Sequence, residues 1–287
     1  AWHLGVAMLP FPDKWFELNE TLREEAETYI EWLEDGKPEE AHKEVPYLQE
    51  IPEVVNKEAQ KLNDWVRETA LHLLNKGKMV ALLGGDHSTP LGLIQALATK
   101  YDNFAILQID AHADLREAYE GFEFSHASIM YNALKIPQMS KLVQIGIRDY
   151  CQAEAELIAD NPHRITTFFD QSIKEKQYQG ATWDNICDEI IAQIPDNVYI
   201  SFDIDGLDPK LCPHTGTPVA GGFEFFEIAY LLKKIVLAGK KIIAFDLVEV
   251  ACGEVENEEW DANVAARMLF KLCNWMGVSQ QKLKLKN

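Results

Sequence analysis

From Lys57 to the carboxyl end, the chain alternates short apolar runs with helical patterns, and this alternation constrains the fold more than any other feature. Apolar residues at three- and four-residue spacing predict an amphipathic helix that starts near Lys57 and ends at Gly77. The predicted strands are Met79–Leu83, Phe104–Ile109, Leu142–Ile147, Arg164–Phe168, Val198–Phe202 and Ile242–Val248. The helices predicted between and after them are Ala127–Leu134, Ala153–Ala159, Trp183–Ile194, Phe225–Leu237 and Asn263–Trp275. Near-continuous apolar strands alternating with helices predict the α/β class, as a three-layer αβα sandwich with a mostly parallel sheet.

The chain shows no linker or internal repeat that would divide it, so we predict one domain over residues 1–287. Residues 1–55 form an amino-terminal segment whose role the sequence does not indicate. Within it, Glu20–Glu34 predicts an acidic helix, and Gly36–Pro52 is a charged stretch punctuated by prolines.

The net charge of −19 disfavours nucleic acid and anionic membranes as partners. The preferred interpretation of this acidity is that it keeps the protein soluble, and a second interpretation is that it attracts cations, either metal ions or a cationic substrate. The five cysteines are scattered and never form a C-x-x-C pair, which predicts neither a disulfide framework nor a zinc knuckle. A reducing cytoplasmic location fits this pattern, as do the absence of a membrane-spanning run and the amino end, which lacks the pattern of a signal peptide.

Polar clusters follow several of the predicted strands. Gly84–Ser88 contains His87 but is a weak signal alone, since a histidine after a glycine turn is more often a structural hydrogen-bonding residue. In the second cluster, an extended chain would point Asp110, His112 and Asp114 to one face. A solvated acidic loop is the alternative, but burying three such groups without a cation would cost several kcal/mol each. The apolar strand that precedes them therefore favours a metal site.

The third cluster, Ser201–Pro209, contains Asp203 and Asp205, which would again share a face. A lone D-x-D motif is commonly an ordinary turn, so this motif indicates a metal site only together with the other two clusters. With the first two clusters it gives two imidazoles and four carboxylates, an oxygen-rich set suited to manganese. Four negative charges balance two divalent cations, which indicates a binuclear site that could lower the pKa of a bridging water.

The motifs together resemble those of the ureohydrolase family, which includes arginases and agmatinases. The family pattern occurs here in order, as Gly84–Ser88, Asp110–Asp114, Ser125-His126, Ser201–Pro209, Thr215–Pro218 and Asp246–Glu249. The resemblance covers roughly Lys57 to the carboxyl end. It implies an arginase-like fold, a homo-oligomer (trimer or hexamer), two Mn²⁺ per subunit (with nickel or another divalent ion possible) and a small guanidino substrate.

The resemblance also implies a role for each matching residue. One manganese would be held by His87, Asp110, Asp114 and Asp203, and the other by Asp110, His112, Asp203 and Asp205, so that Asp110 and Asp203 bridge. The implied catalytic residues are His126, Glu249 and Asp114. His126 would move a proton to the leaving amine, although a histidine at a helix entry is an alternative interpretation. Glu249 would pair with the substrate guanidinium, with Thr217 as a further substrate-binding residue; a plain salt bridge is the alternative for Glu249.

The sequence departs from the family pattern around the pocket. Ala127 stands where glycine usually follows the loop histidine, Pro213-His214 stand where proline-glycine is common, and no proline follows Glu249 within three residues. We interpret His214 as a loop residue and not as a further ligand. None of these changes removes a ligand, so they bear on the substrate more than on the reaction.

The resemblance is greatest to agmatinases, because no asparagine of the arginase type follows Asp114. Hydrolysis of agmatine to putrescine and urea, a reaction of polyamine metabolism, is therefore the expected activity. Arg116 complicates this, because it would repel a second cation or pair with a carboxylated substrate unless it is solvated or paired with Glu117. The other substrates are guanidinobutyrate, arginine, guanidine and formiminoglutamate. From other classes, a zinc deacetylase and a non-catalytic metal-binding scaffold are the alternatives.

Overall fold

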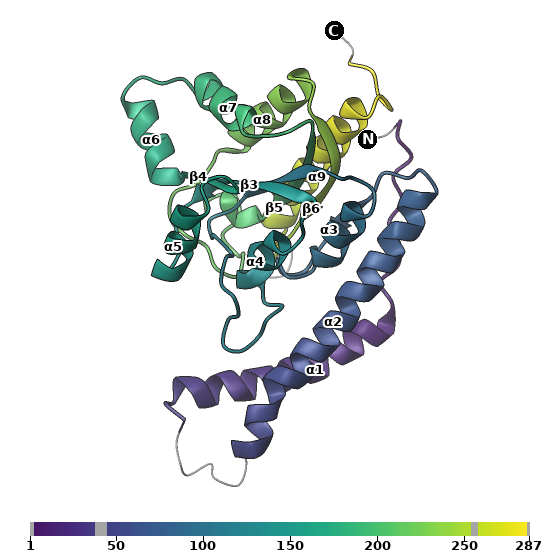
Figure 1. The fold of residues 1–287 in the computed structure, drawn as a ribbon, viewed down its shortest axis with the longest axis vertical. Coiled ribbons are helices and arrows are strands. Elements are labelled where there is room, and N and C mark those ends of the chain that lie inside the picture. The colour runs from purple at the N-terminus through teal and green to yellow at the C-terminus, as the bar shows by residue number, and fades with distance from the viewer. Residues whose placement is uncertain (1–2, 38–44, 254–257, 286–287) are drawn as a thin grey trace.

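Six parallel strands form the centre of the molecule (Figure 1). The structure is a computed structural model that describes residues 3–37, 45–253 and 258–285. The strands are β1 (Ala81–Leu83), β2 (Phe104–Ile109), β3 (Met139–Ile147), β4 (Ile165–Phe169), β5 (Asn197–Phe202) and β6 (Lys241–Leu247). Their order across the sheet is β1-β6-β5-β2-β3-β4, and every pairing is parallel. The predicted parallel sheet is confirmed.

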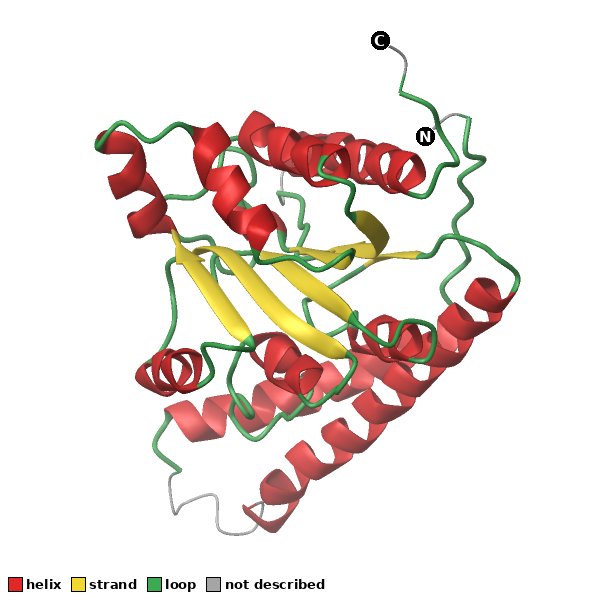
Figure 2. Ribbon diagram, turned by 45° about the horizontal axis from the view of Figure 1, so that its top comes forward, coloured by secondary structure: helices red, strands yellow, loops and turns green. Residues whose placement is uncertain are grey.

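Helices cover both faces of this sheet, as Figure 2 shows. One face packs against α6 (Asp170–Tyr178), α7 (Trp183–Ala192), α8 (Phe225–Leu237) and α9 (Trp260–Ser279). The other packs against α2 (Val45–Asn75), α3 (Leu91–Ala98), α4 (Ile129–Leu134) and α5 (Gln152–Asp160). The three-layer αβα sandwich predicted from the alternating pattern is therefore confirmed.

Strand β2 shows how the two hydrophobic cores arise from the period of two. Ala105, Leu107 and Ile109 enter one core, while Phe104 and Ile106 enter the other, and all five are fully buried. Each large side chain buried in this way contributes roughly 1.5–3 kcal/mol. A strand buried on both faces has no polar alternation, which is why it reads as a continuous apolar run.

The amino-terminal segment is a helical hairpin in which α1 (Asp13–Glu34) lies along α2. The predicted acidic helix lies inside α1. Residues 45–52, the end of the proline-containing stretch Gly36–Pro52, form the first turns of α2, with Pro52 inside the helix. Residues 38–44 of that stretch lie outside the described residues. The single-domain division of residues 1–287 stays a prediction.

Two further helices, α3 and α6, were not predicted, and two short 3₁₀ turns complete the fold: η2 (His126–Ser128) and η3 (Ile204–Gly206). None of the helices in the described part of the chain is long and apolar enough to cross a bilayer. All parallel strands end at one edge of the sheet, which is the place where ligands bind in folds of this class.

Candidate active site

Four neighbouring strands carry the polar clusters at their carboxyl ends. The sheet order β1-β6-β5-β2 places these ends side by side. His87 follows β1, Glu249 follows β6, Asp203 follows β5 and Asp110 follows β2. Residues separated by more than a hundred positions in the sequence thus meet at one edge of the sheet.

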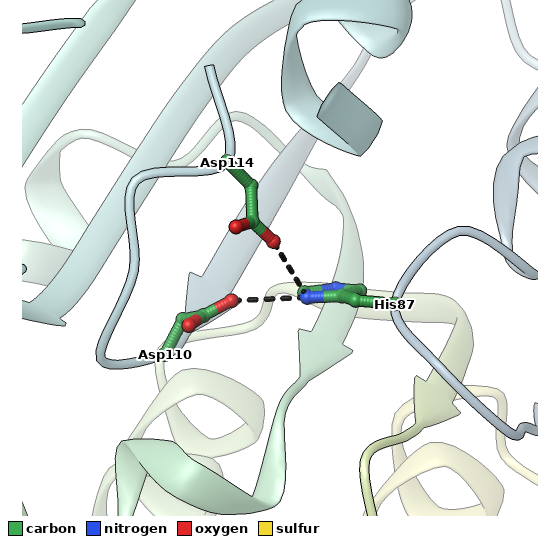
Figure 3. A group of neighbouring side chains, drawn as sticks. All are labelled: His87, Asp110 and Asp114. Atoms are coloured by element: carbon green, nitrogen blue, oxygen red, sulfur yellow. Dashed lines mark ion pairs between the residues drawn. The ribbon is translucent and has the colours of Figure 1, made fainter. Parts of the chain in front are cut away.

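A first group of side chains surrounds the His87 imidazole. His87 Nδ1 lies 3.0 Å from Asp110 Oδ2 and 2.9 Å from Asp114 Oδ2 (Figure 3). Asp203 Oδ2 lies 3.2 Å from the same nitrogen. All four side chains are at most 6% exposed. His87 Nδ1 nevertheless has no hydrogen-bond partner of acceptable geometry among the described residues, so the group has the form of a ligand shell around a cation.

A second group lies beside the first. His112 Nδ1 lies 2.9 Å from Asp205 Oδ2 and 3.6 Å from Asp110 Oδ1. Asp205 Oδ2 is buried and, within the described residues, makes no hydrogen bond of acceptable geometry. One ligand atom from each of the three residues falls within 4.8 Å of the others, as is also true of His87, Asp110 and Asp114.

Asp110 is the residue that the two groups share. Its Oδ2 faces His87 and its Oδ1 faces His112, so one carboxylate can contact two cations at once. Asp203 contacts the first group through Oδ2, while its Oδ1 accepts a hydrogen bond from the Asp205 backbone N–H at 2.9 Å. A bridging role for Asp203 therefore stays a prediction.

The electrostatics of this cluster call for positive charge. Burial, followed by the neighbouring carboxylates, raises the pKa of Asp203 well above its usual value and also raises that of Asp205. Keeping these carboxylates ionised next to one another needs a compensating cation. The donor set of carboxylate oxygens and imidazole nitrogens, with two orphaned buried atoms, fits divalent metal ions.

Turns, not extended chain, bring these side chains together. Asp110 Oδ1 accepts the His112 backbone N–H at 2.7 Å, and Asp203 is the N-cap of η3. Asp114 has a left-handed backbone with φ of 54°. The expectation that each set shares one face of an extended strand was therefore wrong. The side chains converge because each aspartate folds the chain back on itself just past the strand end.

A buried chain of amides supports Asp110, and the sequence reasoning missed it. Gln108 Nε2 donates to Asp110 Oδ2 at 2.8 Å and to the His112 carbonyl at 3.1 Å. Gln144 donates to Gln108 Oε1 at 2.6 Å, and Thr167 donates to Gln144 Oε1 at 2.8 Å. Glutamine in an apolar strand was the available signal, because a buried amide needs partners.

A second buried network orients His87. Its Nε2 lies 2.9 Å from Ser201 Oγ, and Ser201 donates to Asp246 Oδ2 at 2.9 Å. Asp246 also accepts hydrogen bonds from the Tyr199 hydroxyl at 2.5 Å and from the Phe202 backbone N–H at 3.0 Å. The network fixes the imidazole so that Nδ1 faces the carboxylates, as outer hydrogen bonds do for metal-binding histidines.

Glu249 reaches the same site from the end of β6. Its Oε1 accepts the His87 backbone N–H at 2.7 Å, and its backbone has φ of 60°. Burial, followed by the charge of Asp86, raises the pKa of Glu249 to about 7. Thr215, which the sequence analysis did not select, donates to the Glu249 carbonyl at 2.8 Å. Thr217 is exposed on the same loop, and its substrate-binding role stays a prediction.

His126 opens η2, directly after Ser125, whose hydroxyl accepts the Ala127 N–H at 3.2 Å. Burial lowers the pKa of the His126 imidazole, and Asp86 is the strongest charge acting against that shift. The charges of His112 and His87 also act on this imidazole, so it lies near both groups. An imidazole at this position, beside the cluster, can accept and release a proton.

Arg116 and His214, whose roles the sequence left open, have partners outside the two candidate metal groups. Arg116 is 40% exposed, lies 4.0 Å from Glu154 and has its guanidinium carbon 4.9 Å from the centre of the Tyr119 ring, so Glu154 is its partner in place of the suggested Glu117. His214 Nδ1 lies 2.9 Å from Asp261, outside both candidate metal groups. The interpretation of His214 as a loop residue agrees with this placement.

Comparison with known proteins assigns the chain to a protein family. A sequence model described as "Arginase family" matches residues 19–274. The chain belongs to the arginase family. The N(1)-aminopropylagmatine ureohydrolase of Thermus thermophilus is 35% identical over 217 residues, which cover 74% of this chain and 67% of that protein. The agmatinase of Bacillus subtilis is 31% identical over 214 residues, or 74% and 69% of the two chains.

Solved structures of the arginase family share the fold. Proclavaminate amidino hydrolase from Streptomyces clavuligerus superposes with a TM-score of 0.64 at 25% identity, covering 76% of this chain and 70% of that one. A hypothetical agmatinase from Burkholderia thailandensis gives 0.62 at 28% identity, covering 77% and 65%. The arginase-like fold predicted from the motifs is thereby confirmed.

Membership of the arginase family makes the chain a ureohydrolase, an enzyme that hydrolyses a C–N bond of a linear amidine and releases urea and an amine. The family depends on a binuclear metal centre, and the two histidine-aspartate groups described above could bind metal. The predicted family, enzyme class and reaction are confirmed.

Proposed function

We propose that the chain hydrolyses agmatine to putrescine and urea at this site, with two Mn²⁺ per subunit. The observation that carries the proposal is the pair of buried histidine-aspartate groups that share Asp110 beside the carboxylate of Glu249. Two adjacent cations and a carboxylate for the guanidinium are the parts that a metal-dependent guanidine hydrolysis needs.

The metal ligands we propose are His87, Asp110, Asp114 and Asp203 for one ion and Asp110, His112, Asp203 and Asp205 for the other. The distances within each group and the burial of the carboxylates support this division. Oxygen-rich donors favour manganese over metals that prefer thiolates, with nickel or another divalent ion as the alternative. The ions would supply Lewis-acid chemistry and activate water for attack at neutral pH.

Three side chains of the chain would handle the substrate. Glu249 would bind the planar guanidinium with the oxygen that His87 does not use, and so orient its carbon toward the metal groups. Asp114 would use its second oxygen to accept a hydrogen bond from a substrate amino group and stabilise the tetrahedral centre. His126 would take up a proton from solvent and deliver it to the leaving amine; burial lowers the pKa of its imidazole, so the protonated form releases its proton readily.

The charges around the site favour a substrate without a carboxylate. Asp86 and Asp149 are exposed carboxylates at its rim, and Asp149 Oδ2 lies 3.9 Å from His112 Nε2. Arg116, the cation that could have held a carboxylated substrate, is already engaged by Glu154 and Tyr119. A cationic tail such as the amine of agmatine therefore meets negative groups.

N¹-aminopropylagmatine is a second candidate substrate. Relatives from Thermus thermophilus and Synechocystis, at 35% and 32% identity, carry the name N(1)-aminopropylagmatine ureohydrolase. The compound presents the same guanidino group on a longer cationic chain, so the acidic rim suits it equally.

Urea release from the manganese-loaded protein tests the substrate proposal. We expect turnover of agmatine or N¹-aminopropylagmatine at least about a hundredfold above that of guanidinobutyrate, arginine, guanidine and formiminoglutamate, since a missing charge partner in a buried site costs about 3 kcal/mol. Preference for a carboxylated compound would contradict the proposal. Release of acetate from an acetylated amine with zinc would instead indicate the deacetylase, and no turnover with two metals bound would indicate the scaffold.

We also propose a cellular setting and an oligomeric state for the enzyme. All five cysteines are free, which fits a reducing cytoplasm. Apolar side chains such as Met8 and Phe226 are 79% and 75% exposed, which fits burial in a homo-oligomer, either a trimer or a hexamer. The negative charge is consistent with a small cationic partner and with no nucleic-acid or membrane partner.

A further inference from the structure

The loop between β2 and α4 contains a tight turn at Tyr119–Phe122. The two end residues exchange backbone hydrogen bonds, at 3.1 Å and 2.9 Å. The central residues, Glu120 and Gly121, have φ of 54° and 87°, so both are left-handed, as in a type I′ turn. Glycine adopts this conformation freely, whereas glutamate does so at a cost. A turn with glutamate at this position needs support from outside.

Asn56, on α2 of the amino-terminal hairpin, provides that support. Its Nδ2 donates to the Gly121 carbonyl at 3.0 Å, and its Oδ1 accepts the Glu123 backbone N–H at 2.8 Å. The Asn56 amide thus pairs with one backbone carbonyl and one backbone N–H of the loop, the two kinds of group that pair between neighbouring strands. These groups lie 65 and 67 positions away in the sequence, so the contact joins two distant parts of the chain.

Both helices of the hairpin also pack against the turn. A Cβ at Gly121 would lie 3.3 Å from Pro52 Cβ and 3.4 Å from the Tyr29 hydroxyl, so the glycine fits closely between α1 and α2. The Tyr29 and Phe122 rings meet edge to face with centroids 5.7 Å apart. Figure 1 shows the loop reaching from the core toward this hairpin.

The opposite side of the turn contacts the proposed proton carrier. The Tyr119 ring meets the His126 imidazole edge to face, with centroids 5.9 Å apart, and Arg116 stacks on the same tyrosine. The loop therefore runs from the candidate metal ligand Asp114 to His126 and is held at its tip by the hairpin. Movement of the tip would move the wall against which His126 rests.

We propose that the amino-terminal hairpin is a brace for the active-site loop, and that Asn56 is a positioning residue that sets His126 through the Tyr119–Phe122 turn. The proposal rests on the role of His126 in the proposed function. It gives the amino-terminal segment a function in the reaction, since α1 and α2 fix a turn that the loop sequence alone disfavours.

Replacing Asn56 with alanine tests the brace. In the manganese-loaded enzyme, N56A is expected to lower kcat about ten- to a hundredfold, because small misplacement of a reacting group has effects of this size. KM should stay within about twofold, because Glu249 and the metal groups are untouched. Bound metal and melting temperature should match those of Q60A, a control on the next turn of α2 whose amide donates to Asp64 Oδ1 in its own helix.

A second substitution separates positioning from general damage. Asparagine tolerates the left-handed conformation better than glutamate, so N56A/E120N should regain at least half of the lost kcat, while E120N alone stays near wild type. The proposal is overturned if N56A keeps the kcat of Q60A, if its loss equals the loss of folded or metal-loaded protein, or if the double variant stays as slow as N56A.

Limited trypsin cleavage at Arg116 gives a readout that needs neither metal nor turnover. We expect cleavage of metal-free N56A to be clearly faster than that of metal-free Q60A, with the sites identified by mass spectrometry. Equal rates would overturn the brace. If the wild-type enzyme releases no urea from any guanidino compound, the proposed function fails while this comparison still decides whether the hairpin holds the loop.

Discussion

Replacing Asp110 with asparagine is expected to abolish urea release and to reduce bound metal to one ion per chain or fewer. The change removes one negative charge from the carboxylate that both groups share. An asparagine also has no good orientation there, because Gln108 Nε2 donates to one oxygen and the His112 N–H to the other, so its own NH₂ group would face a donor. Loss of several kcal/mol of metal-derived stabilisation lowers the rate by about a thousandfold or more.

Metal analysis and initial rates on the same samples measure this effect. Asp102→Asn is the matched control, since Asp102 is exposed at the opposite end of β2 from Asp110. It should keep two metals and the wild-type rate. An Asp110→Asn enzyme that retains two ions and at least a tenth of the activity would show that Asp110 does not bridge.

Replacing Glu249 with glutamine is expected to lower kcat/KM for the guanidino substrate about a hundredfold, or about 3 kcal/mol, mainly through KM. The glutamine carbonyl can still accept the His87 N–H, as Glu249 Oε1 does at 2.7 Å. The new NH₂ group would then face the guanidinium, which has only donors. The change thus turns attraction into repulsion at the proposed binding atom while leaving the backbone contact in place.

Steady-state kinetics with two controls separate binding from folding. Glu189→Gln makes the same substitution at an exposed salt bridge to Lys176 and should leave KM within about twofold. Metal content should remain two per chain in both variants, because Glu249 is outside the proposed ligand sets. Unchanged kcat/KM in Glu249→Gln would remove Glu249 from the substrate site.

The strands and amphipathic helices were predictable because burial leaves a period in the sequence. The bounds predicted for β2 and α8, Phe104–Ile109 and Phe225–Leu237, are those of the structure. The two missed helices lack that period for opposite reasons. Nearly all of α3 is buried, so it shows no polar face, while α6 is mostly polar and buries only Asp170 and Ile173.

The residues of the site were predictable by type, while their geometry was not. Aspartates and histidines after apolar strands indicated a metal site, and the family pattern supplied their pairing. The turns at Asp110 and Asp203 and the left-handed Asp114 depend on local hydrogen bonds that no periodicity reveals. The neighbours β1, β6, β5 and β2 are likewise set by the sheet order, so contacts such as Glu249 to His87 appear only in three dimensions.

Titration of the chelated, metal-free protein with Mn²⁺ tests the central claim most directly. Urea release with the preferred substrate, followed against the ratio of metal to protein, should start at zero and saturate at two ions per chain. Two ions are expected because the two groups share Asp110 but use different histidines. Full activity in the presence of excess chelator with no bound metal, or saturation at one ion per chain, would contradict the account.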